Sequence, residues 1–193
     1  MKKICILFLV FSCIQTSAQS IKKRTSYLKP QFGILNGNQE NSFQFQLLGG
    51  IVRKSWQLGM GAGIDYYKVR SVPVFADIRK YFGNNNKAFA FVHAGYNIPW
   101  ALDKQHRVSF ISGGGTEKSK FEIGWYTDLG IGYDIELGTN RNLSLSLGYS
   151  LKTLSERYNE SVWIWGTTLP FITERKLDYT FQRLSFKAGF DLW

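Results

Sequence analysis

Few side chains in this chain of 193 residues could carry out chemistry on a bound molecule. Histidine occurs only as His93 and His106, and cysteine only as Cys5 and Cys13. Nucleophilic catalysis needs a serine or cysteine within hydrogen-bond reach of a base such as histidine. Metal binding needs several histidine, cysteine or carboxylate ligands at suitable spacing, and the two histidines have no cysteine near them. The sequence therefore predicts no catalytic residue, no metal and no cofactor.

The N-terminal segment has the pattern of a secretory signal peptide. Two lysines precede an apolar run, and small residues occupy the last and third-last positions of the segment that ends at Ala18. We expect residues 1–18 to be removed and residues 19–193 to form one domain, which then contains no cysteine. A lipoprotein signal with Cys13 as the acylated residue is the alternative, but bulky Phe11 stands where such a signal has a small residue.

Most of the remaining chain alternates between large apolar residues and polar residues or glycine, which is typical of half-buried strands. From Phe121 to Leu137 the odd positions are almost all apolar, and the even positions are mostly glycine or acidic. The 19 glycines and 16% aromatic residues also favour sheets over helices. The predicted fold is all-β, with eight antiparallel strands in up-and-down order at residues 27–35, 42–52, 56–66, 72–82, 88–98, 121–137, 143–151 and 183–192.

The composition of the two strand faces distinguishes a membrane barrel from a soluble one. A soluble ligand-binding barrel is apolar inside, whereas a membrane barrel is apolar outside and polar within. Glycines such as Gly61, Gly130 and Gly132 share a face with the charged residues, and glycine is most useful in the crowded interior of an eight-stranded barrel. Several strands also exceed the ~9 to 11 residues that cross a bilayer. We therefore expect the apolar face to lie in lipid.

The signal segment, the eight alternating strands and the terminal aromatic residue together resemble the small outer-membrane barrels of the OmpA and OmpX type. This resemblance implies integral insertion into the outer membrane by the barrel-insertion machinery, with an insertion signal at Phe190, Leu192 and Trp193. In that family the terminal aromatic residue usually faces lipid in phase with the apolar positions before it. Here Trp193 is out of phase with Phe190 and Leu192.

Some barrels of this type remodel lipid A, so an enzyme is one alternative function. His106 with Ser109 does not reproduce the His-x-Ser spacing of the deacylase family, and His93 falls on the inward face, where it is expected to fill space. A narrow channel is the second alternative. The leading hypothesis is a non-enzymatic barrel with a structural or protein-interaction role. A narrower version of this hypothesis makes the barrel an accessory subunit of a larger outer-membrane assembly.

The predicted interior carries many charges, which persist in a buried site only when paired. We expect salt bridges across the lumen, with an ion-conducting path as the alternative reading. The predicted interior also includes Lys29, Lys152 and Asp191. The nine residues assigned to a luminal charge network are Asp65, Asp77, Arg79, Glu122, Asp128, Asp134, Glu136, Arg183 and Lys187.

The net charge of +10 indicates an anionic partner. The bases are dispersed and no nucleic-acid recognition motif is present, so lipid and lipopolysaccharide are the expected partners rather than nucleic acid. The last loop contains Trp163, Ile164, Trp165 and Phe171, which are apolar for an exposed segment. It is either a two-stranded extension of the last hairpin or a surface that binds another outer-membrane protein. The bases expected at the outer end are Arg70, Lys104, Arg107, Lys118, Lys120, Arg157, Arg175 and Lys176.

Overall fold

Eight long strands form the body of the molecule. The computed structural model describes residues 25–37, 40–83, 86–111, 115–138, 141–162 and 171–192, and the predicted signal peptide and Trp193 lie outside these ranges. The strands of the body are β1 (Ser26–Gly37), β2 (Glu40–Arg53), β3 (Trp56–Asp65), β4 (Ser71–Phe82), β5 (Ala88–Pro99), β9 (Gly124–Gly138), β10 (Arg141–Val162) and β11 (Phe171–Phe190). The connection from β5 to β9 holds the 3₁₀ turn η2 (Asp103–Gln105), β6 (Val108–Ile111), β7 (Gly115–Lys118) and β8 (Lys120–Glu122).

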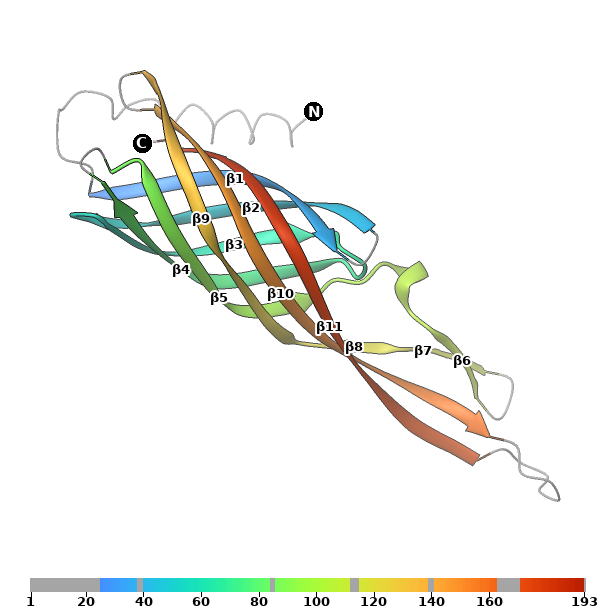
Figure 1. Ribbon diagram of the computed structural model, residues 1–193. Helices are drawn as coiled ribbons and strands as arrows, with labels where there is room; N and C mark the ends of the chain where they lie inside the picture. The colour runs from blue at the N-terminus through green and yellow to red at the C-terminus, as the bar shows by residue number, and fades with distance from the viewer. Residues whose placement is uncertain are drawn as a thin grey trace, which may run out of the picture.

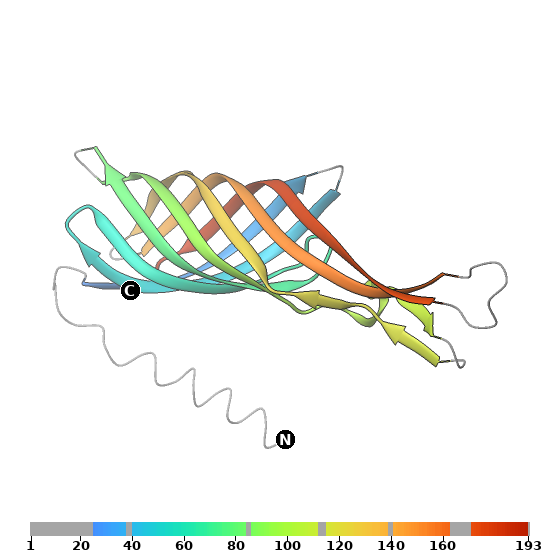
Figure 2. The ribbon, with the colours of Figure 1, turned by 90° about the horizontal axis from the view of Figure 1, so that it is seen from below.

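Each strand pairs antiparallel with its neighbour along the chain, and β11 pairs with β1 to close the barrel (Figures 1 and 2). The closing seam brings Gln31 opposite Gly189 and Asn36 opposite Leu184. The start of β1 and the end of β11 lie together at one end, which we call the inner end. The hairpin of β10 and β11 projects from the opposite, outer end. The prediction of eight antiparallel strands in up-and-down order is confirmed.

The outer surface of the barrel is apolar and its interior is polar. On β9, Leu129 is 52% exposed on the outside, whereas its neighbour Asp128 is fully buried inside. Exposed aromatic residues lie near both strand ends: Tyr66, Tyr96, Trp100 and Trp125 toward the outer end, and Trp56, Phe82 and Tyr133 toward the inner end. This distribution matches a lipid-facing band between two aromatic girdles. No helix among the described residues is long and apolar enough to cross a membrane.

Glycine makes room for aromatic rings inside the barrel. A Cβ atom at Gly61 would lie 2.6 Å from the ring of Phe75, and one at Gly132 would lie 2.7 Å from Cε2 of Phe89. Both rings are almost completely buried. Glycine and large apolar residues thus alternate on one strand because they face opposite sides of it. The glycines face the crowded lumen, and the large apolar residues face outward.

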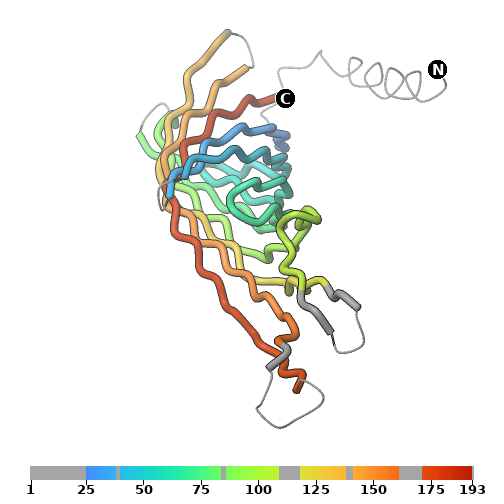
Figure 3. The backbone as a smooth tube through the Cα atoms, turned by 90° about the vertical axis from the view of Figure 1, so that its right-hand side faces the viewer, coloured from blue at the N-terminus to red at the C-terminus, as the bar shows by residue number. Residues whose placement is uncertain are grey.

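The strands differ most from the sequence-based prediction in two places, at Ile123 and in the last hairpin. The predicted strand from Phe121 to Leu137 is divided at Ile123 into β8 and β9. Next to this break, the backbone N–H of Trp125 donates to the hydroxyl of Thr153, 2.7 Å away. The last hairpin also continues as paired strands far beyond the barrel, with Val162 opposite Phe171. We call this extension, formed by the last part of β10 up to Val162 and the first part of β11 from Phe171, the ribbon. It projects beside the β6–β7 hairpin in Figure 3.

Candidate functional site

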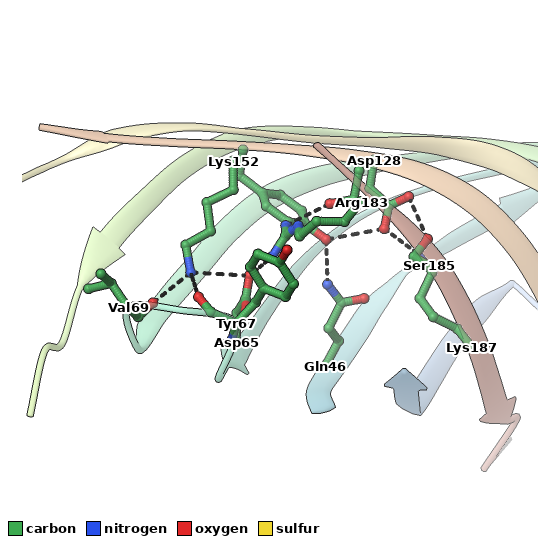
Figure 4. Close-up of polar contacts among 11 residues, drawn as sticks. Gln46, Asp65, Tyr67, Val69, Asp128, Lys152, Arg183, Ser185 and Lys187 are labelled. Atoms are coloured by element: carbon green, nitrogen blue, oxygen red, sulfur yellow. Dashed lines mark hydrogen bonds and ion pairs between the residues drawn. The ribbon is translucent and has the colours of Figure 1, made fainter. Parts of the chain in front are cut away.

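The outer part of the lumen is closed by the connection between β3 and β4. The backbone N–H of Tyr67 donates to Asp65 (2.8 Å), and the Tyr67 hydroxyl donates to the carbonyl of Gly37. From β10, Lys152 Nζ donates to the carbonyls of Tyr67 (3.0 Å) and Val69 (2.6 Å). Figure 4 shows the contacts of Lys152 with Tyr67 and Val69. The connection is therefore held inside the barrel, and its Tyr67 side chain is 1% exposed.

Arg183 of β11 completes this outer cluster, which consists of Asp65, Tyr67, Lys152 and Arg183. Its guanidinium forms an ion pair with Asp65 and donates to the Ser150 hydroxyl at 2.7 Å. Lys152 Nζ lies 3.5 Å from the same carboxylate. Two cations and one carboxylate thus share a fully buried position, with hydroxyl and carbonyl oxygens as further acceptors. Buried charges of this kind are tolerated because nearly every donor has a partner.

The central cluster consists of two ion-pair groups, one around Asp128 and one around Asp77. Lys187 donates to Asp128 Oδ2 at 2.7 Å, and Ser185 donates to Oδ1 at 3.1 Å. Figure 4 shows Asp128 and Ser185 next to the outer cluster. The second group is centred on Asp77, whose carboxylate accepts from Arg79 Nε (3.1 Å) and the Tyr27 hydroxyl (2.6 Å).

His93 belongs to the central cluster. Its Nε2 atom lies 3.0 Å from Asp77 Oδ1, and its ring stacks on Phe75 with 4.5 Å between centroids. His93 is fully buried. It therefore fills space and contacts a carboxylate, as the inward phase of its position predicts.

The inner cluster fills the remaining section of the lumen. Lys29 Nζ donates to Ser144 Oγ (2.7 Å) and lies 3.2 Å from Asp191. Ser144 donates to Asp134 at 2.6 Å, and Tyr81 donates to the second oxygen of that carboxylate at 2.9 Å. Asp134 of β9 thus binds Tyr81 of β4 directly and Lys29 of β1 through Ser144 of β10. The inner cluster extends the polar network to the inner end.

The structure encloses seven of the nine residues assigned to the luminal network and leaves two outside it. Glu122 lies on β8, where its side chain is 38% exposed and pairs with Arg157 at 2.6 Å. Glu136 is 62% exposed near the inner end of β9 and pairs with Lys87 at 3.4 Å. Placing these two acids in the lumen was wrong. Glu136 lies on the inward phase, but beyond the section that neighbouring strands enclose. At Glu122 the phase itself changes, because the pairing with β10 shifts by one residue between β9 and β8 and places Glu122 opposite Ser155 on the outer side.

The lumen is filled rather than open along these clusters. Arg183, Lys152, Asp128, His93 and Asp77 are each 0 to 1% exposed, so water does not reach their side chains. Buried aromatic residues occupy much of the remaining cross-section, namely Tyr27, Phe75, Tyr81, Phe89, Phe91 and Tyr126. An eight-stranded barrel has an interior just wide enough for side chains. A continuous aqueous path through the described side chains would need several of these groups to move together.

A small cavity lies above the outer cluster, at the outer mouth of the barrel. We call it the mouth cup. It has a volume of about 320 Å³ and is lined by Lys68, Val69, Gln105, Arg107, Phe121, Glu156, Tyr179 and Phe181. These residues come from the β3–β4 connection, the η2 turn region, β8, β10 and β11. The cup is thus assembled from segments that meet only when the barrel closes.

The polar groups of the mouth cup are fixed by one another. Arg107 Nε lies 3.3 Å from Glu156 Oε2, and the Tyr179 hydroxyl donates to the same oxygen at 2.7 Å. The hydrogen bond with Tyr179, together with the Glu156 carboxylate, raises the pKa of Arg107 above its ordinary value. Gln105 Nε2 donates to the carbonyl of Lys68 at 2.5 Å, which ties the η2 turn to the β3–β4 connection.

The remaining predicted positions lie on the outer surface or outside the described residues. Phe190 and Leu192 are about half exposed on the lipid-facing surface, and Phe171 is 57% exposed at the start of β11. Trp163, Ile164, Trp165 and Trp193 lie outside the described ranges. His106 lies in the connection before β6, where its Nδ1 atom is 2.6 Å from the carbonyl of Ser119. The Ser109 side chain also lies outside the described part.

The mouth cup was not anticipated from the sequence. Two of its lining residues, Lys68 and Val69, belong to the β3–β4 connection, which follows the alternating segment of β3 and places the adjacent Tyr67 in the lumen. Glu156 lies on β10 and faces inward like Lys152 and Leu154, the alternate residues before it. If the predicted strand had been extended past Leu151, the alternation of inward and outward residues would have identified Glu156. Arg107 carries no such signal, because its position depends on the course of the β5–β9 connection.

Comparisons with known proteins identify solved structures that have a similar fold. No protein-family model and no curated protein matches the chain. Among solved structures, the crystal structure of the outer membrane protein OprG from Pseudomonas aeruginosa is similar, with a TM-score of 0.56 and 11% identity over 88% of this chain and 95% of that one. The solid-state NMR structure of the outer membrane protein AlkL has a TM-score of 0.50 and 12% identity over 92% and 95% of the two chains. The chain therefore has the fold of the small eight-stranded transmembrane β-barrels found in outer-membrane proteins.

Proposed function

We propose that this protein is an integral outer-membrane barrel without enzymatic activity, in which a filled barrel anchors a surface ribbon that contacts other molecules. The single observation that carries this proposal is the closure of the lumen by paired, buried charges from Asp65 at the outer end to Asp134 at the inner end. A barrel filled in this way is a rigid support. The exposed outer end is then the part available for recognition.

The lipid-facing surface supports the membrane location. Large apolar side chains such as Phe32, Met60 and Ile131 are 65 to 69% exposed around the barrel. A contiguous apolar surface on this scale is unusual for a soluble monomer, whereas hydrocarbon covers it in a bilayer. Closure by β1 and β11 also gives each of the eight described wall strands a neighbour on both sides, as a lipid environment requires.

The ribbon carries a ladder of ion pairs rather than an uncompensated basic patch. Arg157 lies 2.6 Å from Glu122 and 3.5 Å from Glu174, and Arg175 lies 2.9 Å from Glu160. Salt bridges on an exposed surface contribute little to stability, but they fix the pattern of charge that a partner meets. Mixed charge of this kind favours a protein partner for the ribbon.

Lipopolysaccharide contact is proposed at the rim below the ribbon. The guanidinium of Arg70 lies 3.8 Å from the centroid of the Trp100 ring, and its Nε donates to the Trp100 carbonyl at 3.0 Å. No carboxylate among the described residues lies within ion-pair distance of Arg70. An arginine stacked on an aromatic residue of the outer girdle is well placed for a phosphate in the adjacent leaflet.

The competing functions are a narrow channel and a lipid A hydrolase. Single-channel recording in planar bilayers tests the first, and mass spectrometry of lipid A from cells with and without the protein tests the second. We expect no discrete conductance steps and an unchanged lipid A profile. Purification in mild detergent followed by mass spectrometry tests the leading function directly, since a stable co-purifying outer-membrane protein is expected.

A matched control separates a specific partner from detergent aggregates. Arg157→Glu and Arg175→Glu together reverse two cations of the ribbon without touching the barrel interior, and Lys80→Glu changes a cation near the inner end. The ribbon variant should lose the partner while the Lys80 variant keeps it. Recovery of the same partner with both variants would contradict a role for the ribbon.

A further inference from the structure

We propose that the inner end of the barrel binds an anionic glycerophospholipid on the lipid-facing surface of β2, β3 and β4. The site combines a row of two cations and a tryptophan with a row of aliphatic side chains next to it. This inference rests on the membrane location within the proposed function. It does not depend on the partner of the ribbon, so the two can fail separately.

Arg53, Trp56 and Lys80 form the first row, which we call the cation row. Arg53 pairs with Trp56 across the β2–β3 turn, and Trp56 pairs with Lys80 of β4. The turn lies at the inner end, near the start of β1 (Figure 1). All three positions have the phase of the lipid-facing residues on their strands. Opposite residues on one face of a sheet have Cβ atoms about 4.5 to 5.5 Å apart, so a cation flanks the tryptophan on each side.

Lys80 is held against the tryptophan ring. Its Nζ atom lies 4.5 Å from the centroid of the Trp56 ring and donates to the Ser55 hydroxyl at 2.9 Å. An ammonium group has three donors, so two of them remain for a ligand. Trp56 is 44% exposed, and its indole N–H is a further donor of the kind found at membrane interfaces. The cation row therefore supplies ammonium, guanidinium and indole donors to one ligand.

The cation row has no counter-charge of its own. In the part of the chain that the structure describes, no carboxylate lies within ion-pair distance of Arg53, Lys80 or Lys54, the exposed residue in the turn. By contrast, Lys87 at the same end pairs with Glu136 at 3.4 Å. Each uncompensated cation near an anionic membrane surface strengthens binding about fivefold. The cation row therefore favours a headgroup with net negative charge, such as phosphatidylglycerol, over a zwitterionic one.

A second row favours a lipid over a free phosphate. Ile51, Leu58 and Ile78 pair with one another across the same three strands, two positions closer to the middle of the barrel. Their side chains are 44 to 58% exposed on the lipid-facing surface. At ~3.3 Å per residue, the two rows lie about 7 Å apart along the strands. A phosphate at the cation row thus places an acyl chain of the same molecule on the aliphatic row.

The leaflet at this end of the barrel supplies such a lipid. Lipopolysaccharide contact is proposed at the opposite rim, near Arg70 and Trp100, so the leaflet at the inner end is the one that consists of glycerophospholipids. Arg53 and Lys80 also suit this depth. Their aliphatic stems can lie along apolar surface while their charged groups reach the headgroup region.

The test is two-dimensional NMR of the refolded mature barrel in nanodiscs in which phosphatidylglycerol replaces phosphatidylcholine in steps. The signals to follow are the Trp56 indole N–H and the backbone N–H groups of Lys54 and Ser55. The Trp125 indole in the outer girdle is the internal reference. We expect the signals of the inner turn to shift with saturation as the fraction of phosphatidylglycerol rises, and the Trp125 signal to change little and without saturation.

Two variants and one matched control test the assignment. Arg53→Gln and Lys80→Gln each remove one cation of the row and should raise the half-saturating fraction of phosphatidylglycerol about fivefold. The double variant should show no saturation. Lys87→Gln makes the same change at the same end, but at a lysine that is paired with Glu136, and should titrate as the parent does. Every variant must show the heat-modifiable gel migration of a folded barrel.

Glycerol 1-phosphate separates a lipid from a free phosphate. It is added to the parent barrel in nanodiscs of phosphatidylcholine alone, where it offers the same phosphate without acyl chains. We expect no saturable shift of the Trp56 indole or of the turn amides. Saturation by this compound would make the cation row a site for free phosphate and would overturn the assignment of a lipid.

Two further results would overturn the proposal. Signals of the inner turn that do not saturate across the phosphatidylglycerol series would show that no lipid is held there. An equal effect of Lys80→Gln and Lys87→Gln would show that the total charge of the inner end, and not the cation row, attracts the lipid. Neither result bears on the partner of the ribbon, which is tested by co-purification.

Discussion

Leu129→Arg is the most direct test of which barrel surface faces lipid. Leu129 is 52% exposed on β9, between the girdle residues Trp125 and Tyr133, which each lie four positions away. At ~3.3 Å per residue and a strand tilt of about 40°, each girdle residue is about 10 Å from Leu129 along the membrane normal. Leu129 therefore lies at the middle of a ~25 Å apolar band.

An arginine at the bilayer midplane costs about 2 to 4 kcal/mol in a β-barrel, and about 0 to 1 kcal/mol near the interface. Leu137→Arg is the matched control, because Leu137 is 57% exposed on the same surface of the same strand. It lies about 20 Å from Leu129 along the normal by the same estimate, beyond the apolar band. The midplane variant should thus lose about 30- to 800-fold in its folding equilibrium constant, and the control less than about tenfold.

The assay is equilibrium refolding into lipid vesicles across a urea series, with the free energy of unfolding as the measured quantity. Both variants are compared with the parent in vesicles of one lipid composition. If Leu129→Arg and Leu137→Arg lowered stability equally, depth in a bilayer would not be the cause. If neither variant lost stability, the apolar surface would not face hydrocarbon, and the assignment of inside and outside would be wrong.

Three further substitutions test the packing of the lumen. Asp128→Asn leaves Lys187 buried without its counter-charge and should cost about 3 to 5 kcal/mol in the same refolding assay, whereas adding Lys187→Met should restore most of that loss. Gly61→Ala places a methyl group against a buried ring and should lower the urea midpoint, whereas Gly49→Ala, whose new atom would lie 3.5 Å from its nearest neighbour, should not. Lys152→Met removes two hydrogen bonds to the β3–β4 connection and should increase amide hydrogen exchange there; unchanged exchange would show that the lysine does not hold this segment.

The alternation in the sequence predicted the barrel well because it reports a local property, the side of the sheet on which each residue lies. Leu129 and Asp128 are assigned correctly by phase alone. The same rule places Glu122 and Glu136 inside, where they are not. The pairing with β10 shifts by one residue between β9 and β8, so Glu122 lies opposite Ser155 on the outer side; Glu136 is outside for a different reason. A residue on the inner face is enclosed only if strands surround it at that height. The strand pairing of β9 with β5 ends at Tyr133, opposite Ala88, so Glu136 lies beyond the enclosed section.

The candidate site was harder to predict because its parts come from connections. Tyr67 enters the lumen because Lys152 and Gly37, which are distant in sequence, offer it partners. Arg107 reaches Glu156 because the β5–β9 connection folds back over the mouth. Neither contact follows from periodicity, which ends where a strand ends. The strand that carries Glu156 does continue its alternation, so that residue alone could have been recognised.

The closing seam has a consequence for how the barrel forms and opens. Six residue pairs, from Gln31 with Gly189 to Asn36 with Leu184, join β1 to β11, whereas twenty pairs join β10 to β11. The six pairs also join the two ends of the chain, so their loop-closure entropy is the largest in the molecule. The β10–β11 hairpin can therefore zip early from local contacts, and the seam closes last. Because this joint has only six pairs, we expect it to open more readily than the β10–β11 joint, so its amides should exchange with solvent before those of β10 and β11.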